Sequence, residues 1–170
     1  MVLWYFWIYS FLGYLLERAF AAVTHAEHQG RRCFLLLPLC PVYGLGMLAV
    51  LALPPDWTEG GWLVISGGLA ATAVEYAVHW AYETTLGIRF WDYANVPGNL
   101  RGRVCLPFTL AWGILTAAAV WWIQLWVERL ASRIPPEATF FCLLLFAADA
   151  LLSARFLWVT GDIEGLRSLS

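Results

Sequence analysis

Three acidic side chains lie well inside long apolar stretches of the sequence: Glu17, Glu75 and Asp149. A charged side chain at the centre of a membrane-spanning helix costs about 2.5–3.5 kcal/mol on insertion scales. Each of these groups must therefore face another helix or a water-filled cavity. Two interpretations stay open. The acids could fix helix packing as buried polar pairs, or they could belong to a binding site, which is the usual role of intramembrane acids.

Further polar residues are expected at the same depth as Glu17 and Glu75, near one end of the helices. Together they form the predicted substrate-binding site: Glu17, Tyr43, Glu75, Trp91, Asp92, Tyr93, Asn99 and Arg103. The Arg103 guanidinium carries five donors, so we expect it to bridge Glu17 and Glu75 as their counter-charge. The prediction is one connected polar cluster that contains Glu17, Glu75, Asp92 and Arg103.

The residue pattern does not favour a metal or a cofactor. Glu75, His79 and Glu83 recur at every fourth position on one helix face, and such a set could hold a divalent metal. A helix end with Glu83 among lipid head groups is the simpler interpretation. The four cysteines contain no Cys-x-x-Cys pair, which argues against structural zinc. The sequence also lacks Gly-x-x-x-x-Gly-Lys-Ser/Thr, so we expect no nucleotide, no metal and no cofactor.

The composition predicts the helices that must position these residues. Of the 170 residues, 61% are hydrophobic and 13% are charged, whereas soluble domains carry about 25% charged residues. One membrane span needs about 20 apolar residues, and the sequence holds five such runs. The predicted fold is an all-α, polytopic transmembrane helix bundle that forms a single domain over residues 1–170, with spans at residues 2–23, 33–53, 61–83, 104–127 and 138–159.

Two segments of this bundle are expected to be irregular. Pro38 and Pro41 should kink the second span. The longest link, Thr84 to Arg103, contains Trp91 and Tyr93, which are poor residues for a freely solvated loop. We therefore expect this link to be ordered and packed against the helices. The first apolar run should remain as a helix, because no basic residue precedes it as in a signal peptide.

The placement of arginine predicts the orientation in the membrane. One side of the bundle, formed by two links and the tail, holds six arginines: Arg31, Arg32, Arg89, Arg101, Arg103 and Arg167. The other side holds Arg129 and Arg133. Because basic residues collect on the cytoplasmic side, we expect a multi-pass protein of the plasma membrane with its N-terminus outside and its C-terminus in the cytoplasm. The net charge of −2 gives no indication of nucleic-acid binding.

Five sequence blocks occur in an order typical of one group of bacterial membrane proteins. They are Ser10–Glu17, Pro38–Gly46, Glu75-Tyr76, Trp91-Asp92-Tyr93 and Asn99–Leu106. From about Phe6 to Leu130, the chain resembles the putative ABC-transporter type IV family, often described as putative ABC transporter permeases. Arg101 stands where a small polar residue would be typical. The resemblance implies transport across the bacterial inner membrane. It also implies a separate ATPase subunit, and so few spans imply a homo-oligomer.

Three functions fit these observations. The first expectation is a small permease-type subunit that binds a polar or charged solute in a cytoplasm-facing cavity. The second is an intramembrane enzyme for a lipid or prenyl substrate, with two carboxyl groups as acid and base and Arg103 holding an anionic head group. Cys40 or Cys105 could then act as nucleophile. The third is a nonenzymatic assembly or sensor protein. The sequence favours a protein that is not an enzyme, and it assigns no catalytic residue.

Overall fold

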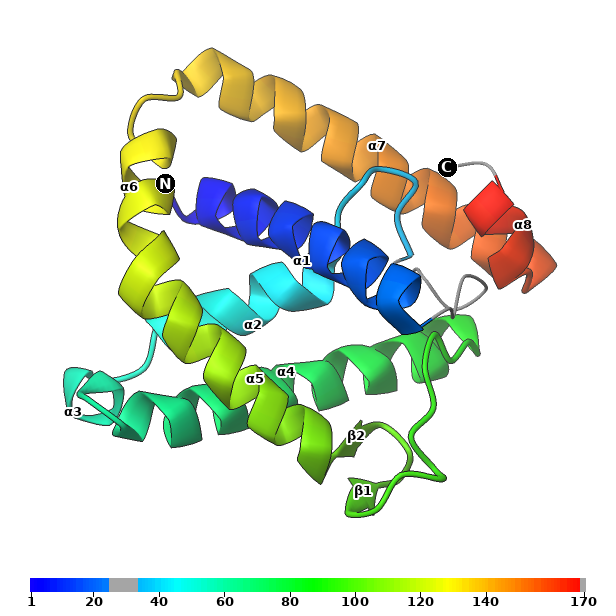
Figure 1. Cartoon of the computed structure of the whole chain (residues 1–170). Coiled ribbons are helices and arrows are strands. Elements are labelled where there is room, and N and C mark those ends of the chain that lie inside the picture. Colours follow the sequence, from blue (N-terminus) through cyan, green and yellow to red (C-terminus); the bar gives the residue numbers. More distant parts are fainter. Residues whose placement is uncertain (25–33, 169–170) are drawn as a thin grey trace.

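The computed structural model describes residues 1–24 and 34–168, and the chain is mostly helical, as predicted. Figure 1 shows long helices that cross one another, with a small β-hairpin at one end. The long helical stretches are α1 (Val2–Thr24), α4 (Trp62–Leu86), α7 (Pro136–Thr160) and the continuous α5 (Leu106–Ala118), η2 (Ala119–Ile123) and α6 (Gln124–Ala131). The shorter helices are α2 (Pro41–Leu51), α3 (Pro55–Thr58) and α8 (Ile163–Ser168).

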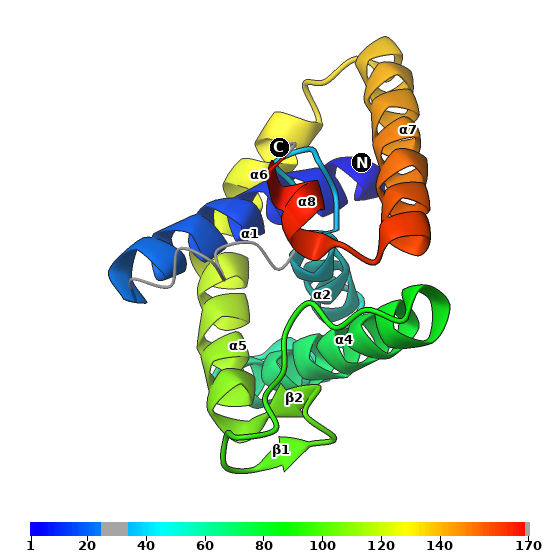
Figure 2. The same ribbon diagram turned by 90° about the vertical axis from the view of Figure 1, so that its right-hand side faces the viewer.

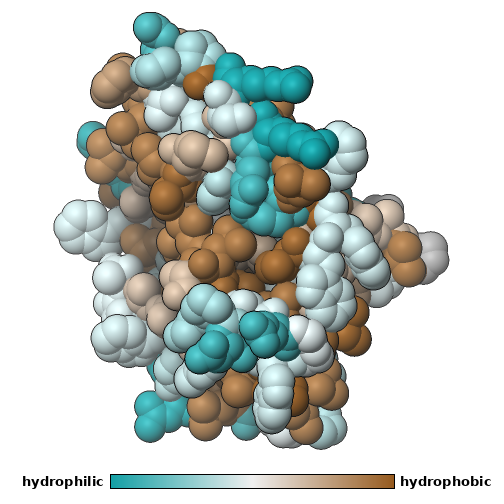
Figure 3. Space-filling model, turned by 90° about the vertical axis from the view of Figure 1, so that its left-hand side faces the viewer, coloured by the Kyte–Doolittle hydropathy of each residue, from teal (hydrophilic) through white to brown (hydrophobic). Residues whose placement is uncertain are grey.

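Two of these stretches are long and apolar enough to cross a membrane. They are Leu106–Ala131, with 26 residues, and Pro136–Thr160, with 25 residues. Most of their side chains point away from the rest of the molecule, and they include Trp122, Trp126 and Trp158. Figure 3 shows apolar residues over much of the face on the α6 side, with hydrophilic residues in separate groups. Such a surface suits lipid better than water. The count of five spans stays a prediction.

The second predicted span is wrong as a single kinked helix. Residue 33 lies outside the described residues, and residues 34–40 are irregular. The helix α2 begins only at Pro41, which occupies its first turn and leaves 11 residues. A proline ring has no N–H to donate and is tolerated in the first turn of a helix but not in its interior. At 1.5 Å per residue, α2 is about 16 Å long, roughly half the thickness of a bilayer core.

Glycines allow the helices to approach closely. A Cβ on Gly13 of α1 would lie 2.2 Å from the Tyr43 ring of α2. A Cβ on Gly113 of α5 would lie 2.3 Å from the backbone oxygen of Val64 in α4. Small residues at such crossings are the usual means of packing helices in lipid, where dispersion contacts must replace the hydrophobic effect. The site described below depends on both crossings.

Replacing Gly113 with alanine should separate α4 from α5 and destabilise the fold by about 1–3 kcal/mol, because a backbone oxygen cannot move aside as a side chain can. The matched control is Gly46→Ala, whose Cβ would meet Ala71 at 3.8 Å, an ordinary contact. Thermal unfolding of the purified protein in detergent measures both variants. Equal melting temperatures for the two would contradict the packing described for α4 and α5.

The link between α4 and α5 contains the hairpin of β1 (Asn99–Leu100) and β2 (Val104–Cys105). The strands are antiparallel, and Asn99 pairs with Cys105. Trp91 and Tyr93 are buried in a cluster with Ile88, Phe90 and residues of α7 and α8. Figure 2 shows this link running beneath α1 and α2, from the end of α4 to the start of α5. The link therefore carries its aromatic side chains inward, toward the helices.

Candidate functional site

A pocket of about 150 Å³ lies where α1, α2, α4, α5 and the 91–93 segment meet. We call it the carboxyl pocket, because Glu17 and Glu75 both line it. Its walls are formed by Leu16, Glu17, Phe20, Val42, Tyr43, Glu75, Trp91, Tyr93, Phe108, Ala111, Trp112 and Leu115. Five of the eight predicted site residues are in this set: Glu17, Tyr43, Glu75, Trp91 and Tyr93.

Glu17 reaches the pocket from α1 and is 6% exposed. Its Oε1 accepts a hydrogen bond of 2.7 Å from the Tyr43 hydroxyl of α2. The Tyr43 ring rests against the position of Gly13, one turn before Glu17 on α1. The close crossing of α1 and α2 thus sets the position of the hydroxyl that meets the acid.

Glu75 lies in the middle of α4 and is 4% exposed. Its Oε1 accepts a bond of 3.0 Å from the Tyr93 hydroxyl, and its Oε2 accepts one of 2.9 Å from Trp112 Nε1. One carboxyl group therefore joins α4, the link and α5. Each oxygen of this buried acid therefore has a hydrogen-bond donor from the protein.

Aromatic rings form most of the remaining wall. The Tyr43 and Trp112 ring centroids are 4.8 Å apart, and Tyr93 stacks on Phe108 at 4.9 Å. Phe20 of α1 approaches Phe108 at 6.5 Å. The pocket thus combines two acids with an apolar, aromatic lining, and aromatic walls with a few placed polar groups are typical of small-molecule sites.

The other three predicted residues lie in the link and do not line the carboxyl pocket. Asp92 accepts a bond from the Ala94 N–H and closes a turn. Asn99 donates to the carbonyls of Ala94 and Val96 and accepts from the Gly102 N–H. These bonds hold the hairpin, where Gly98, Arg101 and Gly102 have positive φ. Asp92 and Asn99 therefore shape the link.

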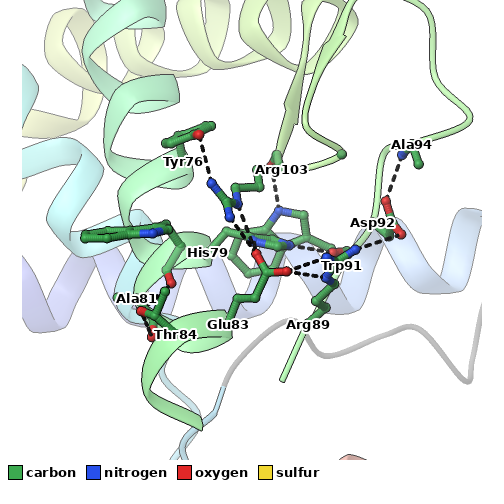
Figure 4. Close-up of polar contacts among 12 residues, drawn as sticks. Tyr76, His79, Ala81, Glu83, Thr84, Arg89, Trp91, Asp92, Ala94 and Arg103 are labelled. Atoms are coloured by element: carbon green, nitrogen blue, oxygen red, sulfur yellow. Dashed lines mark hydrogen bonds and ion pairs between the residues drawn. The ribbon is translucent and has the colours of Figure 1, made fainter. Parts of the chain in front are cut away.

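Arg103 does not bridge Glu17 and Glu75, so that prediction is wrong. Its guanidinium donates to Glu83 Oε2 at 2.7 Å and to the Tyr76 hydroxyl at 2.8 Å (Figure 4). Within the described residues it makes no ion pair with either pocket acid. Arg89 binds the other oxygen of Glu83. The bond to Glu83 raises the pKa of Arg103 and keeps it charged. We call Tyr76, Glu83, Arg89 and Arg103 the Glu83 cluster.

His79 connects the Glu83 cluster to the carboxyl pocket. It is 2% exposed, and its Nε2 lies 2.9 Å from the carbonyl oxygen of Trp91 (Figure 4). Its Nδ1 has no hydrogen-bond partner among the described residues and lies 4.0 Å from Glu83 Oε2. Glu75 turns instead toward Tyr93 and Trp112. In the part of the chain that the structure describes, no three acid, histidine or cysteine side chains gather as metal ligands.

Asp149, the third buried acid, serves the broken segment before α2. Its Oδ1 and Oδ2 each accept a bond of 2.9 Å, from the backbone N–H groups of Leu36 and Leu37. Ser153, one turn later on α7, donates to Oδ1 at 3.0 Å. Irregular backbone at membrane depth must have its polar groups satisfied by protein. The contacts of Asp149 therefore fit a role in packing, whereas Glu17 and Glu75 line a pocket.

The model of the family described as putative ABC-transporter type IV matches residues 4–154. The chain belongs to this family. It matches none of the curated proteins and none of the solved structures with which it was compared.

The match to the type IV family spans the carboxyl pocket, the Glu83 cluster and most of α7. The family's name and the two long apolar helices point to a membrane protein related to ABC transporters. The five sequence blocks that carried the resemblance fall on α1, on the start of α2, on α4 and on the link. Four of these blocks contribute residues to the pocket wall.

Sequence reasoning missed several residues of the two sites, among them Trp112, Tyr76 and Glu83. Trp112 donates to Glu75, yet it lies in an apolar run where tryptophan is unremarkable. Tyr76 and Glu83 hold Arg103, and Glu83 was expected among lipid head groups. One signal was present for this pair. Tyr76, His79 and Glu83 lie three and four residues apart, which places them on one face of α4.

Replacing Arg103 with alanine should loosen the link without collapsing the bundle, because the Glu83 cluster lies beside the pocket and not between its acids. Backbone amides of residues 87–105 should exchange severalfold faster, while those of α4 and α5 keep their protection. Arg101→Ala, at an exposed position of the same hairpin, is the control. Loss of protection throughout the helices would contradict this local role and show that the Glu83 cluster holds the whole bundle together.

Proposed function

We propose that this member of the type IV family is a small permease-type subunit of a membrane transporter and that it binds a polar or charged solute in the carboxyl pocket. The observation that carries the proposal is a pair of buried acids, Glu17 and Glu75, facing one pocket in a helical member of an ABC-transporter family. Acids inside a membrane bundle are costly and mark solute or ion pathways.

The broken segment before α2 supports the same function. Residues 34–40 are irregular, and α2 begins at Pro41, two residues before the pocket residue Tyr43. Transporters commonly build their sites where a membrane helix is interrupted, because the freed backbone groups and the half-helix end can face the solute. Asp149, in the middle of α7, accepts hydrogen bonds from the backbone of this segment, which supports an interruption at membrane depth.

In this proposal the chain crosses the plasma membrane five times, with α2 and the segment before it forming the shortest crossing. The N-terminus lies outside. The carboxyl pocket, which is lined by residues from the second half of α1, opens toward the cytoplasm. The arginine bias supports this orientation, although Arg31 and Arg32 lie outside the described residues. Labelling of Thr58→Cys, but not of Ser168→Cys, by an impermeant reagent on intact cells is the expected result. The reverse pattern would overturn the orientation.

A transporter of this kind needs an energy source that the chain does not contain, so we expect a separate ATPase subunit and a homo-oligomeric membrane part. Purification of the tagged chain from its native membrane in mild detergent, followed by mass spectrometry, tests this. The expected result is a recurrent partner that carries a Gly-x-x-x-x-Gly-Lys-Ser/Thr sequence. An unrelated tagged membrane protein from the same cells is the control. Recovery of the chain without any such ATPase, even after cross-linking, would count against ATP-driven transport.

A further inference from the structure

A second, larger hollow continues from the carboxyl pocket. It has a volume of about 400 Å³ and runs between α1 and the α5–η2 stretch, over a floor formed by α2. We call it the apolar groove. Leu15 and Ala19 line it from α1, Gly46 and Met47 from α2, and Ala119 and Ile123 from η2. Its size falls within the usual range for ligand pockets, about 300–1,000 Å³.

The few polar side chains along the groove are bonded to other protein groups. The Tyr9 hydroxyl donates to Gln124 Oε1 at 2.7 Å. The Thr116 hydroxyl donates to the backbone oxygen of Trp112 at 2.8 Å. Trp112 Nε1 donates to Glu75, and the Tyr43 hydroxyl to Glu17. The surface that these residues present to the groove is therefore mostly carbon. Such a surface suits an apolar chain and offers a polar solute few hydrogen-bond partners.

The groove and the carboxyl pocket share part of their lining: Leu16, Tyr43, Trp112 and Leu115 line both. At the junction the rings of Tyr43 and Trp112 are in contact. The Tyr43 hydroxyl donates to Glu17, and Trp112 Nε1 donates to Glu75. A molecule lying across this junction would pass directly from an acidic, aromatic end to an apolar end.

The shape of the groove selects an elongated occupant. From Trp112 to Ile123 the lining follows one helical stretch for 11 residue steps, about 16 Å at 1.5 Å per residue. This length is close to half of a bilayer core of about 30 Å. On α1 the lining from Tyr9 to Ala19 covers a similar length. The groove is therefore as long as the apolar chain of a lipid in one leaflet.

We propose that the joined pocket and groove bind a single-chain amphiphile, with its apolar chain in the groove and a hydrogen-bond-donating head group beside Glu17 and Glu75. A purely apolar ligand would not use the two acids, and a small polar solute would leave the groove unused. This inference rests on the proposed function in one respect: the carboxyl pocket is taken as the binding site, and the amphiphile is its substrate class.

Photo-cross-linking tests the proposal with the full chain in nanodiscs. The probes are long-chain molecules with a photoreactive group on the chain and either a hydroxyl, an ammonium or a phosphate head. The hydroxyl and ammonium probes should attach to residues 9–19 of α1 and 112–123 of the α5–η2 stretch. The phosphate probe should attach there much less, since the head would face two acids.

A matched pair of variants separates the groove from ordinary lipid contact. Ala19→Trp fills the rim of the groove and should abolish attachment to both segments. Ala22→Trp changes another exposed alanine of α1 that lines neither the carboxyl pocket nor the groove, and attachment should persist. Equal attachment in the two variants, or attachment that covers the outer face of α7 as strongly as the groove, would mean non-specific lipid only and would overturn the proposal.

The outcome is distinguishable from failure of the proposed transport function. If the probes enter the groove but no ATPase is recovered with the chain, the amphiphile site stands and ATP-driven transport fails. If an ATPase is recovered and Ala19→Trp leaves probe attachment unchanged, transport stands and the amphiphile site fails. The two measurements therefore answer separate questions about one pocket.

Discussion

Replacing Asp149 with alanine should destabilise the protein by about 2–6 kcal/mol, because two backbone N–H groups in the broken segment lose this acceptor and each such loss costs about 1–3 kcal/mol. The bonds concerned are those from Leu36 and Leu37, both 2.9 Å long. Stabilities of whole domains are only about 5–15 kcal/mol. The variant should therefore melt far below the parent in detergent, or fail to accumulate in the membrane.

A graded series makes the Asp149 prediction specific. Asp149→Asn keeps one acceptor oxygen and places an amide NH₂ against the other N–H, so its loss should be intermediate. Ser153→Ala removes one bond to the carboxyl group and leaves both backbone bonds in place, so about 1 kcal/mol is expected. Unfolding in detergent ranks the three variants. A loss of stability in Ser153→Ala as large as in Asp149→Ala would show that helix packing explains the effect, and not the two bonds from the backbone of Leu36 and Leu37.

Asp149 also shows what the sequence could and could not predict. An acid within an apolar run must have a polar partner, and this requirement identified Asp149 together with Glu17 and Glu75. Its partners are backbone N–H groups of Leu36 and Leu37, and apolar side chains give no sign of such a role.

The helices were easier to predict than their ends and their contacts. Long apolar runs predicted α1, α4, the α5–α6 stretch and α7, because hydropathy depends only on local composition. The late start of α2 depended on which of two prolines, Pro38 or Pro41, would begin a helix, and both positions are compatible with the pattern. The wider η2 turn at residues 119–123 has no marker in the sequence that we recognise.

The candidate site could be predicted only in part, for a similar reason. Glu17, Tyr43, Glu75, Trp91 and Tyr93 could be grouped because the predicted helices and the link between two of them place all five at one depth, and the pocket does bring them together. A depth predicted from sequence is coarse along the helix axis. Arg103 pairs with Glu83, eight residues and about two turns beyond Glu75 on α4. Pairing among several acids at nearby levels needs the three-dimensional arrangement.

Replacing Glu75 with glutamine should leave the fold largely intact but remove ligand from the carboxyl pocket. The amide oxygen can still accept from Trp112 Nε1, which can only donate, and the amide NH₂ can donate to the Tyr93 hydroxyl, which can also accept. Glu75→Ala offers neither group and leaves a cavity, so we expect a loss of about 2–5 kcal/mol there. The two variants thus separate the charge of Glu75 from its place in the packing.

Two measurements on each variant decide the role of Glu75. Unfolding in detergent should rank the parent and Glu75→Gln close together, with Glu75→Ala well below them. Native mass spectrometry of gently purified protein should find small molecules bound to the parent and absent from both variants. Tyr93→Phe removes one donor to the same carboxyl group and keeps the charge and the ring, so it should retain bound ligand. If Glu75→Gln bound ligand as well as the parent does, the carboxyl group at this position would be needed only for packing, as at Asp149. That result would contradict the proposal that the carboxyl pocket is a binding site.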